Sequence, residues 1–148
     1  MGTRKLGFSA LMTAIFNRLS TTDPVTSAAA FGTFYNHVPR NATMPYHVMG
    51  QPLGRESLMF NTRDTEAEEN VIQIDSWVDE ASGKGDKPCA DMMNNIVQAM
   101  TNAAFVMASY DNSYIVFLDF ANILKDDTES GKIIRHGVLR FRVEMAPT

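Results

Sequence analysis

Residues Ile133–Met145 constrain the fold of this chain more than any other segment. From Leu139 onward, large apolar residues (Leu139, Phe141, Val143 and Met145) alternate with charged residues (Arg140, Arg142 and Glu144). Alternation with a period of two is typical of a β-strand that has one face buried and the other in water. A shift of one residue in the strand pairing would bury both arginines, so the register of this strand is fixed.

The length and charge of the chain set broad limits on what it can be. The chain has 148 residues, a usual length for one domain with its own core, so residues 1–148 are predicted to form a single domain. Thirteen basic and seventeen acidic residues give a net charge of −4. This balance argues against charge-driven DNA binding, which needs a basic surface. No segment is long and apolar enough to cross a bilayer, and no secretory signal is recognisable, so synthesis in a cytoplasm is expected.

Two segments have the spacing of amphipathic helices. In residues 6–20 the apolar face is made by Phe8, Leu11, Met12, Ile15, Phe16 and Leu19. In residues 87–104 it is made by Cys89, Met92, Met93, Ile96, Val97 and Met100. Asp86 and Pro88 suit the start of the second helix, as an N-cap and a first-turn proline. Cys89 is the single cysteine and is expected to be a small core residue.

Further strands are predicted at residues 71–79 and 114–124, and a β-hairpin at residues 35–50. In the first of these strands Ile72, Ile74 and Val78 share one side, so Trp77 lies on the polar side and needs a partner surface. The strand at 114–124 is apolar on both sides, with Tyr114, Val116, Leu118 and Phe120 on one and Ile115 and Phe117 on the other. It is therefore expected to be covered on both sides.

Residues 51–69 are predicted to be a long loop that carries the acidic residues Asp64, Glu66, Glu68 and Glu69, for which a solvated surface is the ordinary location. Together the segments predict an α+β domain with a mostly antiparallel sheet of about four to five strands and two main helices packed on one face. Two helices on one face leave the other face to loops or to a neighbouring subunit.

No recognisable motif points to catalysis, a metal or a cofactor. His37, His47 and His136 lack the spacing of metal ligands, and His136, on the wet side of the last strand, is expected to be a surface residue. The glycines match neither a phosphate-binding loop nor a dinucleotide fingerprint, and there is no nucleophile elbow. The chain is therefore predicted not to be an enzyme, and to use no cofactor and no metal.

Four stretches of the chain stand out by their order and spacing. They are Ile15–Ser20, Tyr35–Pro39 followed by Met44–Gly50, Ile72–Trp77 with the glycine-containing loop and helix after it, and Arg135–Val143. In these stretches the chain resembles the tail-completion, or tail-terminator, family of long-tailed phages and gene transfer agents. Each motif is short, and it is their order and spacing along most of the chain that make the resemblance. The chain departs from the family in residues 20–33 and in the segment after Gly50.

The resemblance implies a structural virion protein that forms a ring, usually a hexamer, at the neck, the head-proximal end of the tail. Such a ring stops the growth of the tail tube and joins the tail to the head connector. The implied partners are further copies of the chain, the tail tube protein and a head-side connector or stopper protein. DNA would pass through the lumen without specific binding, no membrane is involved, and the protein would be made in the host cytoplasm.

On this interpretation the candidates for the oligomer interface are Trp77, Ile115, Phe117, Arg140 and Arg142. The candidates for the lumen are Asp64, Glu66, Glu68 and Glu69, because their carboxylates would repel DNA phosphates. Two alternatives remain open. One is a different connector component, such as a head-completion or adaptor protein on the portal side, and the other is a small ligand-binding α+β module.

Overall fold

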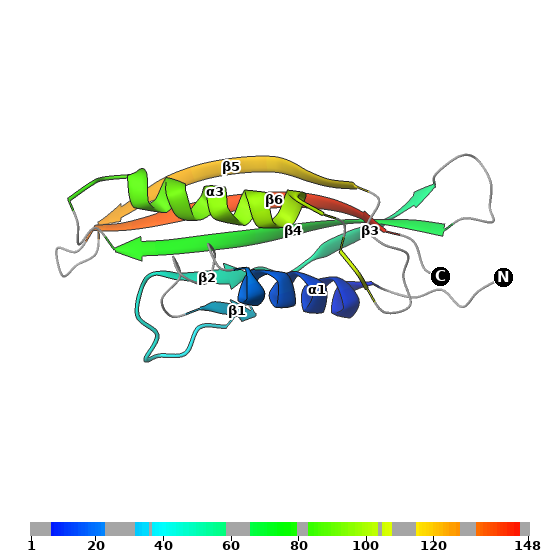
Figure 1. Ribbon diagram of the computed structural model, residues 1–148, viewed down its shortest axis with the longest axis horizontal. Coiled ribbons are helices and arrows are strands. Elements are labelled where there is room, and N and C mark those ends of the chain that lie inside the picture. The colour runs from blue at the N-terminus through cyan, green and yellow to red at the C-terminus, as the bar shows by residue number, and fades with distance from the viewer. Residues whose placement is uncertain are drawn as a thin grey trace.

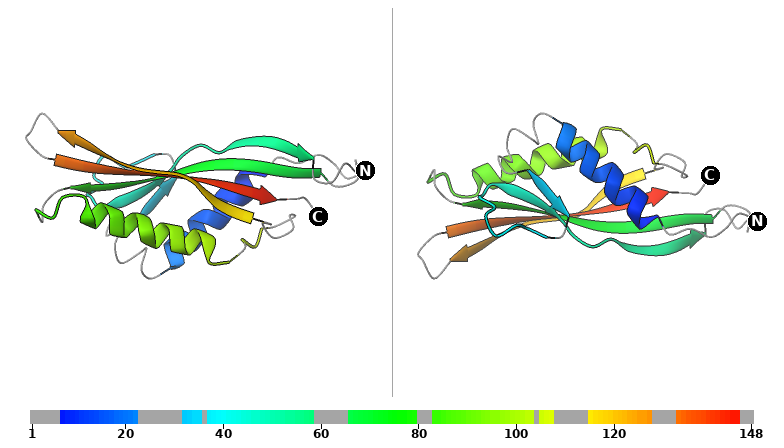
Figure 2. Two further views of the ribbon diagram at one scale, coloured as in Figure 1. Left: turned by 90° about the horizontal axis from the view of Figure 1, so that it is seen from above. Right: turned by 90° about the horizontal axis from the view of Figure 1, so that it is seen from below.

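The computed structural model describes residues 7–22, 32–35, 37–58, 66–79, 83–103, 105–107, 115–127 and 133–145. Two helices, α1 (Phe8–Thr21) and α3 (Lys87–Thr101), lie on one side of a twisted sheet (Figure 1 and Figure 2). The sheet has six strands: β1 (Thr33–Tyr35), β2 (Tyr46–Met49), β3 (Leu53–Leu58), β4 (Glu66–Asp79), β5 (Ile115–Asp127) and β6 (Ile133–Met145). The predicted α+β class is confirmed, with both helices on one face and one strand more than expected.

Strands β4 and β6 form the centre of the sheet. The strand order is β1-β2-β4-β6-β5, and β3 also pairs with β4. On the side of β4 away from β6, β2 pairs with residues 74–77 and β3 pairs with residues 66–71, both antiparallel. Strand β5 therefore forms one edge of the sheet, while β1 and β3 lie at the opposite edge.

Two of the predicted segments are wrong. The hairpin at 35–50 is not formed, because β1 pairs with β2 in the parallel direction, and a tight turn cannot join parallel strands. The loop at 51–69 is in part a β-hairpin, in which β3 pairs with the first half of β4 from Leu53 opposite Val71 to Leu58 opposite Glu66. Strand β4 thus begins at Glu66 instead of Val71. Its glutamates concealed the strand, because glutamate has a low β-propensity.

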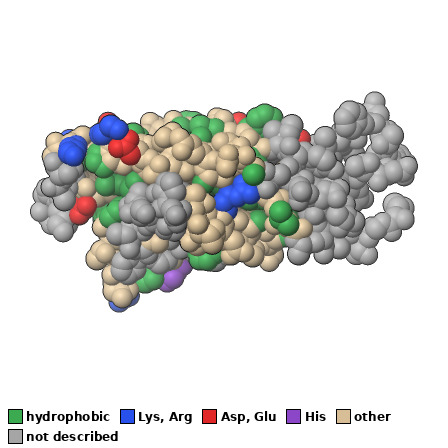
Figure 3. Space-filling model, in the orientation of Figure 1, with side chains coloured by type: hydrophobic (Ala, Val, Ile, Leu, Met, Phe, Trp, Pro, Cys, Tyr) green, Lys and Arg blue, Asp and Glu red, His purple; other side chains and the backbone are tan. Residues whose placement is uncertain are grey.

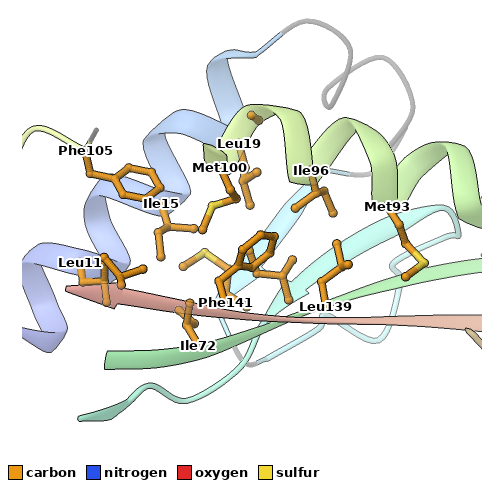
Figure 4. Close-up of a cluster of buried hydrophobic side chains, with 14 of the residues drawn as sticks. Leu11, Ile15, Leu19, Ile72, Met93, Ile96, Met100, Phe105, Leu139 and Phe141 are labelled. Carbon is orange, nitrogen blue, oxygen red and sulfur yellow. The ribbon is translucent and has the colours of Figure 1, made fainter. Parts of the chain in front are cut away.

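The hydrophobic core lies between the helices and the sheet (Figure 4). Its buried residues include Leu11, Ile15 and Leu19 of α1, Cys89, Met92, Met93, Ile96, Ala99 and Met100 of α3, Ile72, Ile74 and Val78 of β4, and Leu139, Phe141, Val143 and Met145 of β6. The predicted apolar side of the last strand is therefore confirmed in full. Neither helix has the length and apolar character needed to span a bilayer in the described part of the chain.

Gly137 allows α3 to lie close to β6. A Cβ atom at this position would lie 2.6 Å from Met93 Sδ and 2.9 Å from Cys89 Sγ. Two residues earlier on the same side of β6, Arg135 Nη1 lies 3.0 Å from Asp86 Oδ1 at the start of α3. The Asp86 side chain makes no capping hydrogen bond, contrary to the prediction, because its carboxylate pairs with Arg135 instead. The ion pair and the glycine together fix the start of α3 against the sheet.

Arg18 fixes the other end of α3. Its guanidinium donates to the carbonyl oxygens of Ala99 and Ala103 and lies 4.0 Å from the centroid of the Phe105 ring. The last carbonyls of a helix have no partner within the helix, so this arginine of α1 satisfies the end of α3 and joins the two helices. On the helix-covered side the charged side chains gather mainly over the start of α3, where Lys87 pairs with Asp91 (Figure 3).

Candidate interaction surface

The side of the sheet opposite α1 and α3 carries no helix in the described part of the chain, and we call it the open face (Figure 2). Cross-strand partners share a face of a sheet, so the register assigns residues to it. They are Tyr46 and Val48 of β2, Leu53 of β3, Val71, Gln73, Asp75 and Trp77 of β4, His136, Val138, Arg140 and Arg142 of β6, and Phe117, Phe120, Asn122 and Leu124 of β5. The open face is therefore a mixed surface of aromatic, aliphatic and charged side chains.

A β-bulge decides which residues of β5 lie on the open face. Leu118 pairs with Phe141 and Phe120 pairs with Arg140, so the backbone of Asp119 between them has no opposite residue in the register with β6. The extra residue resets the alternation, and Phe120 falls on the same face as Phe117 instead of the face of Leu118. The prediction that Phe120 shares a face with Leu118 is wrong for this reason.

The cover expected on both sides of this strand is not supplied within the single chain, and cover by a neighbouring subunit stays a prediction. On the open face Phe117 is 46% exposed, and Phe120 and Leu124 are each 44% exposed. Strand β5 is an edge strand, so its side chains have a neighbouring strand on one side only. Three large apolar side chains therefore follow the open-face side of β5 and remain in water.

Trp77 stacks on His136 of the adjacent strand, with ring centroids 3.9 Å apart and an angle of 10° between the ring planes. His136 Nε2 lies 3.1 Å from Asp75 Oδ1, and the Gln73 side chain donates to the same carboxylate oxygen at 3.0 Å. The partner surface expected for Trp77 is thus supplied in part by its own chain. The role of His136 was missed because it depends on the register, which places His136 opposite Trp77.

The two arginines of the open face have different surroundings. Arg142 Nη2 lies 2.9 Å from Asp119 Oδ1, and Arg142 Nε lies 3.7 Å from Glu69 Oε1, so this arginine joins the bulge of β5 to β4. Arg140 lies 5.4 Å from the centroid of the Phe120 ring and donates to the Gln73 side chain at 3.4 Å. No carboxylate among the described residues pairs with Arg140, so its charge is available to a partner.

The residues predicted for the interface and for the lumen are placed differently. Trp77, Phe117, Arg140 and Arg142 come together on the open face, and Ile115 lies opposite Glu144 in the register. The lumen candidates are not brought together on one described surface.

Glu68 lies on the helix side, where both carboxylate oxygens accept the Gly7 N–H at 3.1 Å, next to the start of α1. Negative charge is favourable at a helix N-terminus. Glu69 belongs to the other side of β4 and is only 8% exposed. Glu66 is the first residue of β4, and Asp64 lies outside the described residues. The assignment of these four residues to a lumen stays a prediction.

Among the described residues, the buried ionisable groups outside the open face are a histidine and a cysteine of the core. His47 Nδ1 lies 3.0 Å from Ser76 Oγ in the core, and burial lowers the pKa of His47 to about 4, so its ring is neutral at pH 7. Burial also raises the pKa of the Cys89 thiol to about 11. The described residues contain no group of three or more His, Cys, Asp or Glu side chains that could hold a metal ion. A groove of about 560 Å³ near the end of α3 is lined by Thr22, Asn95, Gln98, Ala99, Thr101 and Asn102, none of which titrates near neutral pH.

Comparison with known proteins identifies the family. No curated protein matches the sequence. One solved chain, from the virion of a native gene transfer agent particle, superposes with a TM-score of 0.70 at 17% identity, over 93% of this chain and 96% of that chain, which shows a shared fold. A second solved chain aligns over 91% of both chains at 11% identity, with a TM-score of 0.44 that is too low to indicate a common fold. The family model of tail completion protein gp17 matches residues 13–145, and the chain therefore belongs to this family of structural proteins of the phage virion.

Proposed function

We propose that this chain forms a closed ring, a hexamer, at the head-proximal end of the tail tube. The ring ends the growth of the tube and joins the tail to the head-side connector. The observation that carries this proposal is the open face, where Phe117, Phe120 and Leu124 are exposed along an edge strand. Exposed apolar patches with polar surroundings mark sites of protein association, and a second copy would remove this patch from water.

The composition of the open face suits a stable contact. Specific interfaces bury about 800 Å² on each partner, and aromatic residues and arginine supply most of the binding energy. Trp77, Phe117, Phe120 and Arg140 are residues of this kind on one surface. Copies of the chain, the tail tube protein and the head-side connector are the proposed partners, and in this role the chain is a structural component instead of a catalyst.

DNA would pass through the ring without specific binding. The net charge of −4 opposes adhesion of phosphate groups, and the charge of Arg142 is balanced within the chain by Asp119 and Glu69. Reversing the charge of Glu66, Glu68 and Glu69 tests whether these residues line the lumen. If particles with the reversed charges are intact and deliver DNA normally, these three glutamates do not line the lumen.

Light scattering of the purified protein over a range of concentrations tests the ring. The wild-type protein is expected to reach a single assembled species with six times the mass of one chain. Phe120→Ser should weaken assembly at least about fivefold, because an aromatic anchor of an interface contributes more than about 1 kcal/mol. Val106→Ser is the matched control, since Val106 is exposed but lies outside the open face.

Electron microscopy of tails places the protein in the particle. Tails assembled without the protein should have tubes of variable length that fail to join heads. A protein that stays monomeric at every concentration and does not bind the ends of isolated tail tubes contradicts the proposal. Its presence on tailless heads and absence from tails would favour an adaptor on the portal side. A melting temperature that rises with a small molecule would favour a ligand-binding module.

A further inference from the structure

We propose that the ring closes by pairing of strand edges, with β5 of one copy adding to β3 of the next copy. This inference rests on the proposed ring and names the two surfaces that form it. Its occupant is a second copy of the same chain. The sheet then continues from one subunit to the next around the ring.

Both strands have a free edge in the described part of the chain. Strand β5 pairs only with β6, and β3 pairs only with β4. An exposed strand edge presents unpaired N–H and C=O groups that can pair with another chain. The part of β5 after the bulge, residues 120–127, is long enough to pair with every residue of β3.

Five of the six large apolar side chains that are exposed in the described part of the chain lie at these two edges. Six large hydrophobic residues are exposed among the described residues: Leu53, Val106, Phe117, Leu118, Phe120 and Leu124. Four belong to β5, and Leu53, which is 74% exposed, belongs to β3 at the opposite edge. A ring needs two different patches on opposite sides of each subunit, and the apolar residues are arranged in this way.

The apolar side chains of the two edges also lie on the same face of the sheet, as a continuous sheet requires. Leu53 pairs with Val71, so it shares the open face with Phe120 and Leu124. A sheet that continues into the next copy keeps its faces. The Leu53 side chain of one copy would therefore lie next to the apolar side chains of β5 in its neighbour.

Strand directions favour this pair of edges. Strand β3 runs antiparallel to β4, whereas β5, which is antiparallel to β6, runs in the same direction as β4. Rotation about a ring axis that follows the strands leaves these directions unchanged, so β5 meets the neighbouring β3 antiparallel. Antiparallel pairing is the more stable arrangement.

The competing contact is between two β5 strands, and the regular stretch after the bulge at Asp119 would permit it as well as pairing with β3. A contact between two β5 strands would, however, be two-fold symmetric and would stop at a dimer. The ring therefore requires a second, different edge.

Cysteine cross-linking tests the pairing. The double variant Leu53→Cys/Leu124→Cys, and Leu53→Cys/Phe120→Cys as a second register, are treated with a short bis-maleimide under conditions where light scattering shows assembly. All three sites are exposed, so folding should be preserved. The native Cys89 is buried and is not expected to react while the chain is folded. Val106→Cys/Leu124→Cys is the control pair, because Val106 is 82% exposed but lies on neither edge.

At least one of the two double variants is expected to give a ladder of covalent oligomers that extends beyond the dimer and ends at the size of the ring. The single variants and the control pair should remain single chains. An assembled ring without a ladder, a ladder from the control pair, or dimers from Leu124→Cys alone would overturn the edge pairing while leaving the ring intact. A wild-type chain that never assembles would instead remove the proposed function, and this inference with it.

Discussion

Replacing Gly137 by alanine tests whether the close approach of α3 to β6 determines the position of the helix. The added Cβ would lie 2.6 Å from Met93 Sδ and 2.9 Å from both Cys89 Sγ and Met93 Cγ. These distances are well below van der Waals contact. The methionine can turn away, but the cysteine has a short side chain on a helix that Arg135 also holds in place.

The magnitude follows from two opposing effects. Overpacking a filled core costs about 1–3 kcal/mol. Alanine in place of glycine restricts the unfolded chain and returns up to about 1 kcal/mol where the backbone angles suit alanine. The net expectation is a loss of about 1–2 kcal/mol in the free energy of unfolding, which lowers the melting temperature by about 3–6 °C for a chain of this size.

Urea unfolding followed by circular dichroism measures the change. Asn94→Ala is the control, since Asn94 is an exposed residue of the same helix. In a double-mutant cycle with Met93→Ala, the double variant should be more stable than the sum of the single changes by at least about 0.5 kcal/mol, because the new methyl group occupies the space that Met93 leaves. Unchanged or increased stability of Gly137→Ala, or additive effects in the cycle, would refute the packing argument.

Three further predictions concern side chains away from the open face. Burial lowers the pKa of His47 to about 4, so below about pH 6.5 the unfolded chain binds a proton that the folded chain does not bind. The free energy of unfolding of the wild type should therefore fall by about 2 kcal/mol between pH 7 and pH 5. His47→Gln should remove that part of the pH dependence, whereas His37→Gln, at an exposed site, should not. Arg18→Met should cost about 1–2 kcal/mol in urea unfolding, because the last carbonyls of α3 and the Phe105 ring lose their partner, and an unchanged midpoint would contradict this role. Cys89 should react with a thiol reagent at pH 8 only at the rate of unfolding, because burial raises its pKa to about 11; rapid labelling of the folded protein would show that the site opens locally.

The helices and the two central strands were predictable because their burial is decided locally. The residues of α1 and α3 that face the sheet repeat with the helical period, and β4 and β6 each have one apolar side. Each of these elements needs only a flat apolar neighbour, so its own pattern is sufficient to identify it. The end of α3 was placed too late, at residue 104 instead of Thr101. There Arg18 of another helix donates hydrogen bonds to the final carbonyl oxygens, and this long-range contact leaves no local signal.

The outer strands could not be predicted from local pattern. Strand β1 pairs with β2 in the parallel direction. This direction depends on the path of the segment that connects the two strands, and not on the residues of either strand. Strand β3 was hidden because Arg55 and Glu56 interrupt its apolar residues and because Gly54 is required by tertiary packing. A Cβ at Gly54 would lie 2.7 Å from the Phe8 ring and 2.5 Å from Asn70 Oδ1. The glycine therefore belongs to a strand that passes close to α1, where the sequence alone indicates a turn.

The bulge in β5 shows why the interaction surface is harder to predict than the fold. Strict alternation places Phe117 and Phe120 on opposite faces, which describes a strand buried on both sides. One unpaired residue, Asp119, moves Phe120 to the open face, and the Asp119 carboxylate then contacts Arg142 on that same face. The extra residue therefore places both phenylalanines on the open face of an edge strand, with a paired charge beside them. If Asp119 were deleted, Leu118 would stay opposite Phe141 and Phe120 opposite Arg140, so the bulge would disappear while Phe120 keeps its place on the open face. This variant should therefore fold and still assemble. Loss of assembly in the folded variant would show that the bulge, and not the apolar residues of the open face, determines the contact.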